Sequence, residues 1–472
     1  MAAISEDDFI ALVRKAEQDA ATSPQAYTLK LALFAVLGYL VIFLVLAALI
    51  GLTGGLFGVA LLGHGIFLLL LKTKLLFAAI PAIWLLLRAL WVKFEPPQGH
   101  VLKRKDYPAL FAELDALSRE LKSLKIHEVI LDKRLNAAVV QHPRLGLLGW
   151  QKNYLILGYQ LLLTLSVEEM RSVLAHELGH LSGNHSRFGG WIYRVRRTWG
   201  QVMASFSQAQ SWGSRLLGRF FDWYSPRFDA YSFVLARRNE YEADSIAARL
   251  TSPEIASRAL VSVYVTEPYL EENYWPGFYR DADEYDKPQY QPLAGLSHFV
   301  ATQAPGQDKI LQHIRQAMSV ETHYADTHPS LKDRLAALGA APQVPTAPAV
   351  SAAEAWLGAG NRQVMEMLDQ EWLGENLESW QQRHAYVSNA RQHLQAFAQV
   401  SPDMLDDPSL WNYAWWTHDL VSREQAIPLF QAYQARHPQD PDTAYFIGMH
   451  QLQQNDPAGL DQLRLARKCV PD

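Results

Sequence analysis

Cysteine is almost missing from this chain of 472 residues, in which Cys469 is the single one. One cysteine excludes an intramolecular disulfide and a cysteine-ligated zinc site, and it suits the cytosol without excluding other compartments. Long basic runs are also missing, and the net charge is −5. Proteins that bind nucleic acid carry a basic patch or stripe, so we expect no nucleic acid among the partners. The length allows two or three domains.

Charge is missing from a long stretch near the N-terminus. Residues 31–71 contain one ionisable side chain, His64. As one helix this stretch would measure about 62 Å, roughly twice the thickness of the hydrocarbon core of a bilayer. The glycine-rich segment 51–55 is therefore a natural break, and a further apolar stretch with one arginine follows. We expect a transmembrane hairpin of two or three spans in residues 31–93; a hairpin buried in a soluble core is the alternative.

Lysine and arginine residues flank this hydrophobic segment on both sides. The heavier flank is the one expected in the cytoplasm. The flank after the segment has more basic residues than the flank before it. Arg14, Lys15 and Lys30 precede the segment, and four basic residues follow it: Lys93, Lys103, Arg104 and Lys105. We expect an integral protein of the bacterial inner (cell) membrane, in contact with lipid, whose following domain faces the cytosol. Residues 1–30 are predicted to be an N-terminal amphipathic segment.

The five residues His-Glu-Leu-Gly-His, which begin at His176, have the HExxH form of zinc peptidases. Ser166 and Glu169 form an S-x-x-E capping box upstream and predict the start of a helix. On that helix His176 and His180 are four residues apart, so both imidazoles can reach one metal ion. Glu177 can act as general base on a water at that metal. A chance occurrence on a solvated helix is the alternative, because patterns this short give false positives.

A catalytic zinc site needs a third protein ligand. One known pattern places a third histidine six residues after the second, but Ser186 occupies that position, and the nearby His185 would point away on a continued helix. A carboxylate from a second helix is the alternative. Glu240 and Asp244 are four residues apart and share a helix face, whereas Glu242 points elsewhere. One of the two can bind the metal while the other fixes the tautomer of a histidine ligand, and the spacing leaves that assignment open.

Three motifs in this order resemble metallopeptidase family 48. They are His-Glu-Leu-Gly-His from His176, Glu-Tyr-Glu-Ala-Asp from Glu240, and His-Pro-Ser-Leu-Lys-Asp-Arg from His328. This family of gluzincin zinc proteases includes HtpX, the CAAX prenyl endopeptidase, and the Oma-type and BepA-type proteases. The resemblance covers roughly residues 95–340. It implies a mainly α protein whose peptidase domain, residues 94–339, has a zincin-like α+β fold.

The resemblance also implies roles for individual residues. One Zn²⁺ ion per chain is held by His176, His180 and Glu240, and Asp244 is the partner that orients a histidine ligand. Family members carry an Asn-Ala segment on an edge strand beside the cleft. An extended peptide would add to that strand, and the matching segment here is Asn136, Ala137, Ala138 and Val139.

Glu177 and His328 are the catalytic residues that we expect. Glu177 takes a proton from the attacking water and passes it to the leaving amine. The developing oxyanion needs a hydrogen-bond donor, for which His328 is the candidate, with Arg334 supporting it. A helix-capping histidine and a structural ion pair are the alternative reading of His328 and Arg334.

One stretch departs from the membrane-embedded members of the family. HtpX and the prenyl protease have transmembrane helices between the HExxH motif and the third ligand. Residues 186–235 instead hold several arginines and no apolar run of about 18 residues. We expect soluble helices there, with an aromatic cluster that packs in the core or covers the cleft: Phe220, Phe221, Trp223 and Tyr224.

The remaining patterns predict a small sheet and a helical C-terminal domain. A helix at 107–125 and strands at 128–131 and 154–159 lie beside the HExxH helix. Residues 340–351 are rich in proline and alanine and predict a linker. Residues 352–472 are helical in pattern and, at a spacing of about 33 residues, resemble tetratricopeptide repeats; an irregular array of α-hairpins is the alternative.

These patterns predict a membrane-anchored zinc-dependent metalloendopeptidase that hydrolyses polypeptide substrates in membrane protein quality control or processing. The C-terminal repeats would bind a protein partner. Two alternatives stay open. One is a repeat-domain adaptor or chaperone-like protein with restricted protease activity, and the other is an envelope-facing protease of the BepA type.

Overall fold

The computed structural model describes residues 4–61, 96–143, 151–182, 188–196, 199–200, 212–302 and 307–469. The second part of the predicted transmembrane hairpin, residues 62–93, lies outside these ranges, as do His185 and Ser186.

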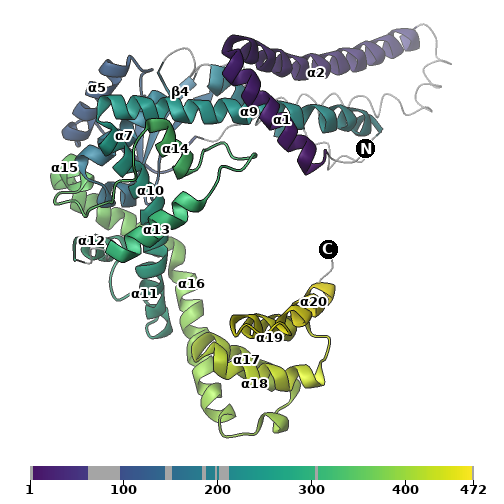
Figure 1. Cartoon of the computed structure of the whole chain (residues 1–472), viewed down its shortest axis with the longest axis vertical. Coiled ribbons are helices and arrows are strands. Elements are labelled where there is room, and N and C mark those ends of the chain that lie inside the picture. Colours follow the sequence, from purple (N-terminus) through teal and green to yellow (C-terminus); the bar gives the residue numbers. More distant parts are fainter. Residues whose placement is uncertain are drawn as a thin grey trace. The chain divides into compact units, whose positions relative to one another are not determined.

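The chain divides into two compact units, and helices dominate both (Figure 1). The large unit comprises Met1–Glu272 and Leu293–Leu368, and the small unit comprises Asn273–Pro292 and Asp369–Asp472. The residues proposed as a linker, 340–351, therefore lie within the large unit, together with the segment that follows them up to Leu368.

The large unit contains a four-stranded sheet in the order β1-β2-β4-β3. Strands β2 and β4 pair in parallel, while β1 with β2 and β3 with β4 pair antiparallel. Leu131 and Leu155 are fully buried because the two central strands are rich in apolar residues. Strand β3 is the last strand of the order, so one of its edges is unpaired among the described strands. The strands are β1 His100–Leu102, β2 Glu128–Asp132, β3 Ala137–Pro143 and β4 Gln151–Gly158.

Two helices carry the predicted ligands. Helix α7, Val167–Gly179, begins with the predicted capping box, in which Ser166 and Glu169 exchange hydrogen bonds. It packs against the long helix α9, Trp212–Leu250, and against β3. Gly179 lies at the contact between these helices, where a Cβ atom would be at an ordinary van der Waals distance of 3.4 Å from the Cα of Ala243.

Smaller helices surround this pair. Helix α5, Pro108–Leu121, lies within the range 107–125 that was predicted to be helical, and it packs against α7. Helix α14, Leu331–Leu338, starts at its cap Ser330 and packs against α9. The other helices of this unit are α6 Tyr159–Thr164, α10 Pro253–Asn273, α12 Pro292–Thr302, α13 Gln307–Ser319, α15 Ala352–Leu357 and the start of α16, Asn361–Phe397.

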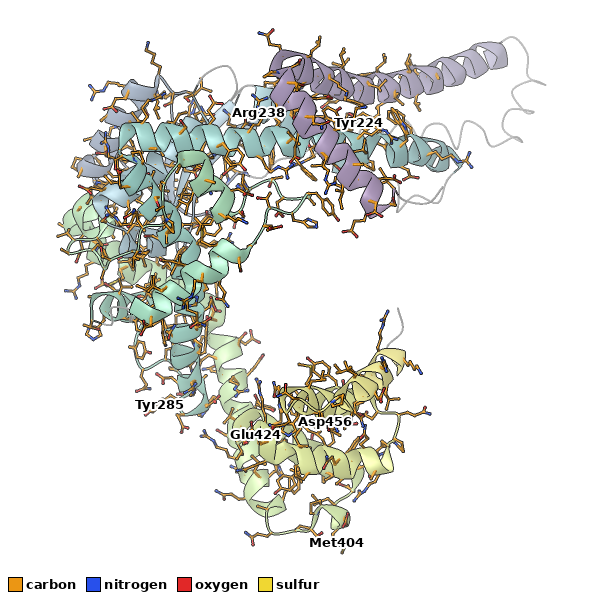
Figure 2. All side chains as sticks on the ribbon, viewed as in Figure 1. Tyr224, Arg238, Tyr285, Met404, Glu424 and Asp456 are labelled. Atoms are coloured by element: carbon orange, nitrogen blue, oxygen red, sulfur yellow. The ribbon has the colours of Figure 1, made fainter. Side chains whose placement is uncertain are left out.

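The N-terminal helices share a core with α9. Helix α1, Glu6–Thr22, packs against α9, and helix α2, Pro24–Leu61, packs against both (Figure 1). Phe221 and Tyr224, from the aromatic cluster of the sequence, are buried in this core, whereas Trp223 is 46% exposed; Tyr224 is labelled in Figure 2.

Helix α2 differs from its prediction. Its first part, Pro24–Ala48, is long and apolar enough to cross a membrane by length and composition, and it is the one such helix among the described residues. The predicted break at residues 51–55 is wrong, because the helix continues to Leu61. Glycine lowers helix propensity by about 1 kcal/mol but ends a helix mainly by adopting a positive φ. Gly51, Gly54 and Gly55 do not have a positive φ.

The small unit is built from helices. Helix α11, Trp275–Arg280, contributes Phe278, whose ring packs against Trp372 and Trp380 of α16. The last four helices pack consecutively, and Ala414, Phe430 and Ile447 lie in their core. Helical character is therefore as predicted, whereas the tetratricopeptide repeat remains a prediction. These helices are α17 Asp407–Leu420, α18 Arg423–Arg436, α19 Pro441–Gln453 and α20 Gly459–Cys469.

Candidate metal centre

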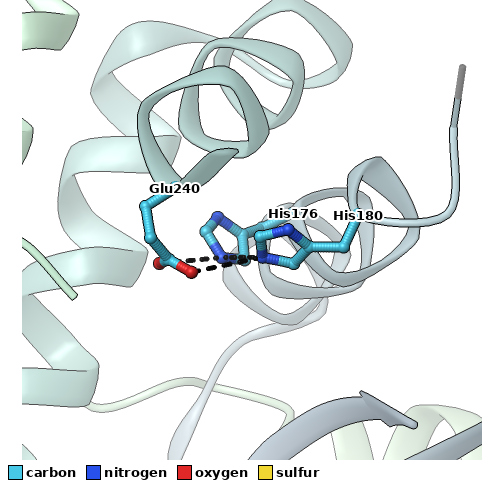
Figure 3. Close-up of side chains that lie close together, drawn as sticks. All are labelled: His176, His180 and Glu240. Atoms are coloured by element: carbon cyan, nitrogen blue, oxygen red, sulfur yellow. Dashed lines mark hydrogen bonds and ion pairs between the residues drawn. The ribbon is translucent and has the colours of Figure 1, made fainter. Parts of the chain in front are cut away.

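Three predicted ligands meet between α7 and α9 (Figure 3). His176 lies in the last turn of α7 and His180 caps the helix, while Glu240 comes from the facing side of α9. One ligand atom from each residue lies within 4.8 Å of the others. The structure therefore brings together residues that are 60 positions apart in the sequence, and two of them, His180 and Glu240, also line one pocket.

The spacing of these atoms fits a zinc ion. The two histidine Nε2 atoms are 3.2 Å apart, and the Glu240 carboxylate oxygens lie 3.6 Å from Nε2 of His176 and 3.5 Å from Nε2 of His180. Ligand atoms about 2.05 Å from a tetrahedral zinc are about 3.3 Å apart. Two imidazoles and one carboxylate are also a donor set of catalytic zinc sites, which keep a fourth position open.

The protonation states of His180 and Glu240 favour metal binding. Burial and the neighbouring His176 lower the pKa of His180 to about 4, so its imidazole is neutral at pH 7. Burial would raise the pKa of Glu240, but the three surrounding histidines, His328 first, lower it to about 2. The site therefore presents a neutral nitrogen donor and an ionised carboxylate at neutral pH.

Asp244 lies one helical turn beyond Glu240 and holds His176. Nδ1 of His176 is 2.9 Å from Oδ1 of Asp244, and donation of the Nδ1 proton to this carboxylate leaves Nε2 for a metal. Arg334 of α14 donates two hydrogen bonds to the same carboxylate, at 2.8 and 2.6 Å. Asp244 and Arg334 are both buried, and the pair holds the imidazole of His176 at Nδ1, the ring nitrogen that does not face the other ligands. From the sequence we expected Arg334 to support His328 or to form a structural ion pair, and in the structure it pairs with Asp244.

Glu177 faces the edge strand. The backbone N–H of Val139 donates a hydrogen bond to Oε2 of Glu177 at 3.0 Å. Burial raises the pKa of Glu177, and Glu240 adds to this effect, while His176 and the Val139 N–H oppose it. A carboxylate with a raised pKa is a better proton acceptor than an ordinary one.

His328 lies on the opposite side of Glu240. Its Nδ1 is 3.2 Å from Oε2 of Glu240, and its side chain is 70% exposed. The hydrogen bond to Glu240 raises the pKa of His328 against the effect of burial. The imidazole thus stands at the rim of the site, within reach of a ligand there.

A pocket of about 320 Å³ opens beside the metal centre. His180 and Glu240 line it together with Val139 of the edge strand and with Arg194 and Asn239. The sequence predicted helices within residues 186–235, but it did not place the helical segment 188–196 in the wall of a pocket. The adjacent glycines Gly189 and Gly190 were the available signal, since a Cβ atom at Gly190 would lie 2.5 Å from Oε1 of Gln141 on β3.

Residues 127–341 match the model of Peptidase family M48. This segment belongs to peptidase family M48. The match includes all three ligands, Glu177 and the motif from His328 to Arg334, and the family resemblance of the three motifs is confirmed. No curated protein and no solved structure matches the chain. The match of this segment supports a metallopeptidase, and the His176, His180 and Glu240 cluster is its possible metal site.

Proposed function

We propose that this protein is a membrane-anchored zinc-dependent endopeptidase. The observation that carries the proposal is the convergence of His176, His180 and Glu240, with Glu177 beside them, inside the M48 segment. These three ligands would hold one zinc ion. Zinc in such a site supplies a Lewis acid that polarises the scissile carbonyl and lowers the pKa of water.

Glu177 would be the general base. Its buried carboxylate would take a proton from the attacking water and pass it to the leaving amine. His328 would donate a hydrogen bond to the oxygen of the scissile carbonyl as negative charge develops there. Its exposed position at the rim of the site supports this role.

Strand β3 would bind the substrate. Ala138 and Val139 are on the strand, Ala137 begins it, and Asn136 precedes it and accepts a hydrogen bond from the N–H of Gly158. The N–H of Val139 bonds to Glu177 rather than to β4, so it faces the catalytic side. An extended peptide added along this edge would run past Glu177, which suits cleavage within a chain and gives recognition through the backbone.

Helix α2 supports membrane anchoring. Its side chains Leu33, Leu40, Phe43 and Leu44 are each at least half exposed, as expected of a surface that contacts lipid. We propose that the catalytic domain faces the cytosol of a bacterial inner membrane, that the substrates are membrane proteins in quality control or processing, and that the small unit binds a protein partner.

The test is hydrolysis by purified protein loaded with zinc. Wild type is expected to cleave unstructured casein, and Glu177→Gln is expected to retain zinc and fold while losing about three orders of magnitude in rate, because the base is gone. Equal rates for the two proteins at equal zinc content would refute the proposed chemistry.

A further inference from the structure

Helix α1 contacts the loop that carries His328, although the two are more than 300 residues apart in the sequence. The hydroxyl of Tyr324 donates a hydrogen bond to Oε1 of Glu6 at 2.7 Å. The ring of Tyr324 packs edge-on against Phe9, with centroids 5.6 Å apart. Three residues lie between Tyr324 and His328, so α1 contacts this loop close in sequence to the residue that pairs with Glu240.

Arg237 makes a second connection between α1 and the loop. It lies on α9 one turn before the metal ligand Glu240 and is only 6% exposed. Its guanidinium donates a hydrogen bond to Oε1 of Glu17 on α1 at 2.8 Å and to the carbonyl oxygen of His323 at 3.4 Å. Arg237 therefore joins α1, α9 and the loop through a buried side chain, although its partners Glu17 and His323 are exposed.

The loop is closed at its base by its own hydrogen bonds. Thr322 donates to Asp333 at 2.6 Å and accepts from the N–H of Ser330 at 2.8 Å. The segment between these two points includes Tyr324 and His328. The His328 side chain forms an ion pair with Glu240, and the placement of this imidazole depends on how the loop is held.

The position of α1 is in turn fixed at its junction with α2. Asp19 of α1 accepts hydrogen bonds from Lys30 of α2 at 2.8 Å and from the hydroxyl of Tyr231 of α9 at 2.7 Å. One residue, Ser23, separates α1 from α2. The candidate membrane helix is thus connected to the His328 loop through a single rigid element.

We propose that α1 is a positioning element of the metal centre, with Glu17 and Glu6 as positioning residues that hold His328 against Glu240 through Arg237 and Tyr324. This inference rests on the proposed function, because it assigns α1 an effect on the chemical step. Loss of either contact weakens the hold of α1 on the loop but removes no ligand and no part of β3. The step that needs His328 slows, and substrate binding along β3 is unchanged.

Kinetics of the full-length, zinc-loaded protein provide the first test. Glu17→Gln and Tyr324→Phe are each expected to lower kcat about threefold while KM and zinc content stay at wild-type values. Asp7→Asn is the matched control, because Asp7 is an exposed acid of the same helix. An unchanged kcat in both variants of an active enzyme would overturn the inference.

A double-mutant cycle asks whether α1 acts through His328. In a His328→Ala background, Glu17→Gln is expected to have no further effect on kcat. If the two losses multiply, α1 acts on the site by another route and the inference is wrong. If His328→Ala alone keeps full activity, the inference also fails, while zinc-dependent hydrolysis by Glu177 stands.

A spectroscopic measurement tests the contact between α1 and the loop independently of enzyme activity. A spin label on Ala325→Cys, in a Cys469→Ser background, reports the mobility of the exposed loop. We expect greater mobility in Glu17→Gln than in the labelled parent, with Asp7→Asn unchanged. Equal mobility in all three proteins would contradict the positioning role. If the wild-type protein holds zinc but cleaves nothing, the proposed function fails, and this measurement still decides whether α1 holds the loop.

Discussion

Nδ1 of His176 lies 2.9 Å from the carboxylate of Asp244, and this contact sets which nitrogen of the imidazole can bind a metal. Arg334 donates two hydrogen bonds to the same carboxylate. Asp244 is 2% exposed, so the charge of the carboxylate is compensated by the guanidinium inside the protein. Metal affinity and folding stability therefore both depend on Asp244.

Replacement of Asp244 by asparagine is expected to weaken zinc binding about 10- to 100-fold, because the amide orients and polarises His176 less well. The measurement is a competition titration with a zinc chelator. Asp283→Asn is a control far from the ligands in sequence and lies in the small unit. Unchanged zinc affinity in Asp244→Asn would show that the carboxylate has no part in metal binding.

The metal-free protein is expected to lose stability in acid through the same residue. Burial opposes ionisation of Asp244, but Arg334 and His176 lower its pKa from 3.8 to about 2. Because the folded pKa is the lower one, the ionised group stabilises the fold above pH 4, by about 2 kcal/mol, and this contribution disappears as the pH falls from about 4 to 2. Urea unfolding at several pH values should show that the difference in free energy of unfolding between wild type and Asp244→Asn becomes smaller over that interval. A difference that stays constant with pH would contradict the lowered pKa of Asp244.

Glu240 and Glu242 provide a matched pair for the ligand assignment. Glu240 is buried at the metal centre, whereas Glu242 is exposed on another face of α9. We expect Glu240→Ala to lose the zinc and Glu242→Ala to hold one zinc ion per chain, as measured by metal analysis after gel filtration. Full zinc content in Glu240→Ala would transfer the ligand role to another carboxylate.

Membrane topology can be tested by labelling. In a Cys469→Ser background, a cysteine at Lys103 should react with an impermeant maleimide only after the cytosolic side of sealed vesicles is exposed, because the heavier basic flank stays in the cytosol. Labelling from the outside would favour the envelope-facing alternative.

The small unit is expected to affect substrate access rather than chemistry. The zinc ligands and β3 belong to the large unit, so removal of residues 401–472 should leave zinc content and cleavage of a short unstructured peptide unchanged. Digestion of a folded protein substrate should slow or accelerate. Loss of zinc, or an equal change for both substrates, would make these helices part of the catalytic fold.

The sequence by itself determined the parts of this protein that depend on local spacing. The capping box at Ser166, the i,i+4 placement of His176 and His180, and the helical phase that separates Glu240 from Glu242 are all local, and the structure reproduces each of them. Helical geometry relates residues a few positions apart in the same way in every helix, so these relations could be predicted without a fold.

Tertiary structure decided which distant residues meet. The three ligand residues come from two helices, and Arg334 pairs with Asp244. Glu6 contacts the loop of His328, and Glu17 contacts Arg237, which donates to that loop. The end of α2 was also misjudged, because a glycine-rich segment breaks a helix only when its backbone leaves the helical region. Contacts between segments hundreds of residues apart depend on how whole helices pack. The spacing of residues within one segment therefore cannot predict them.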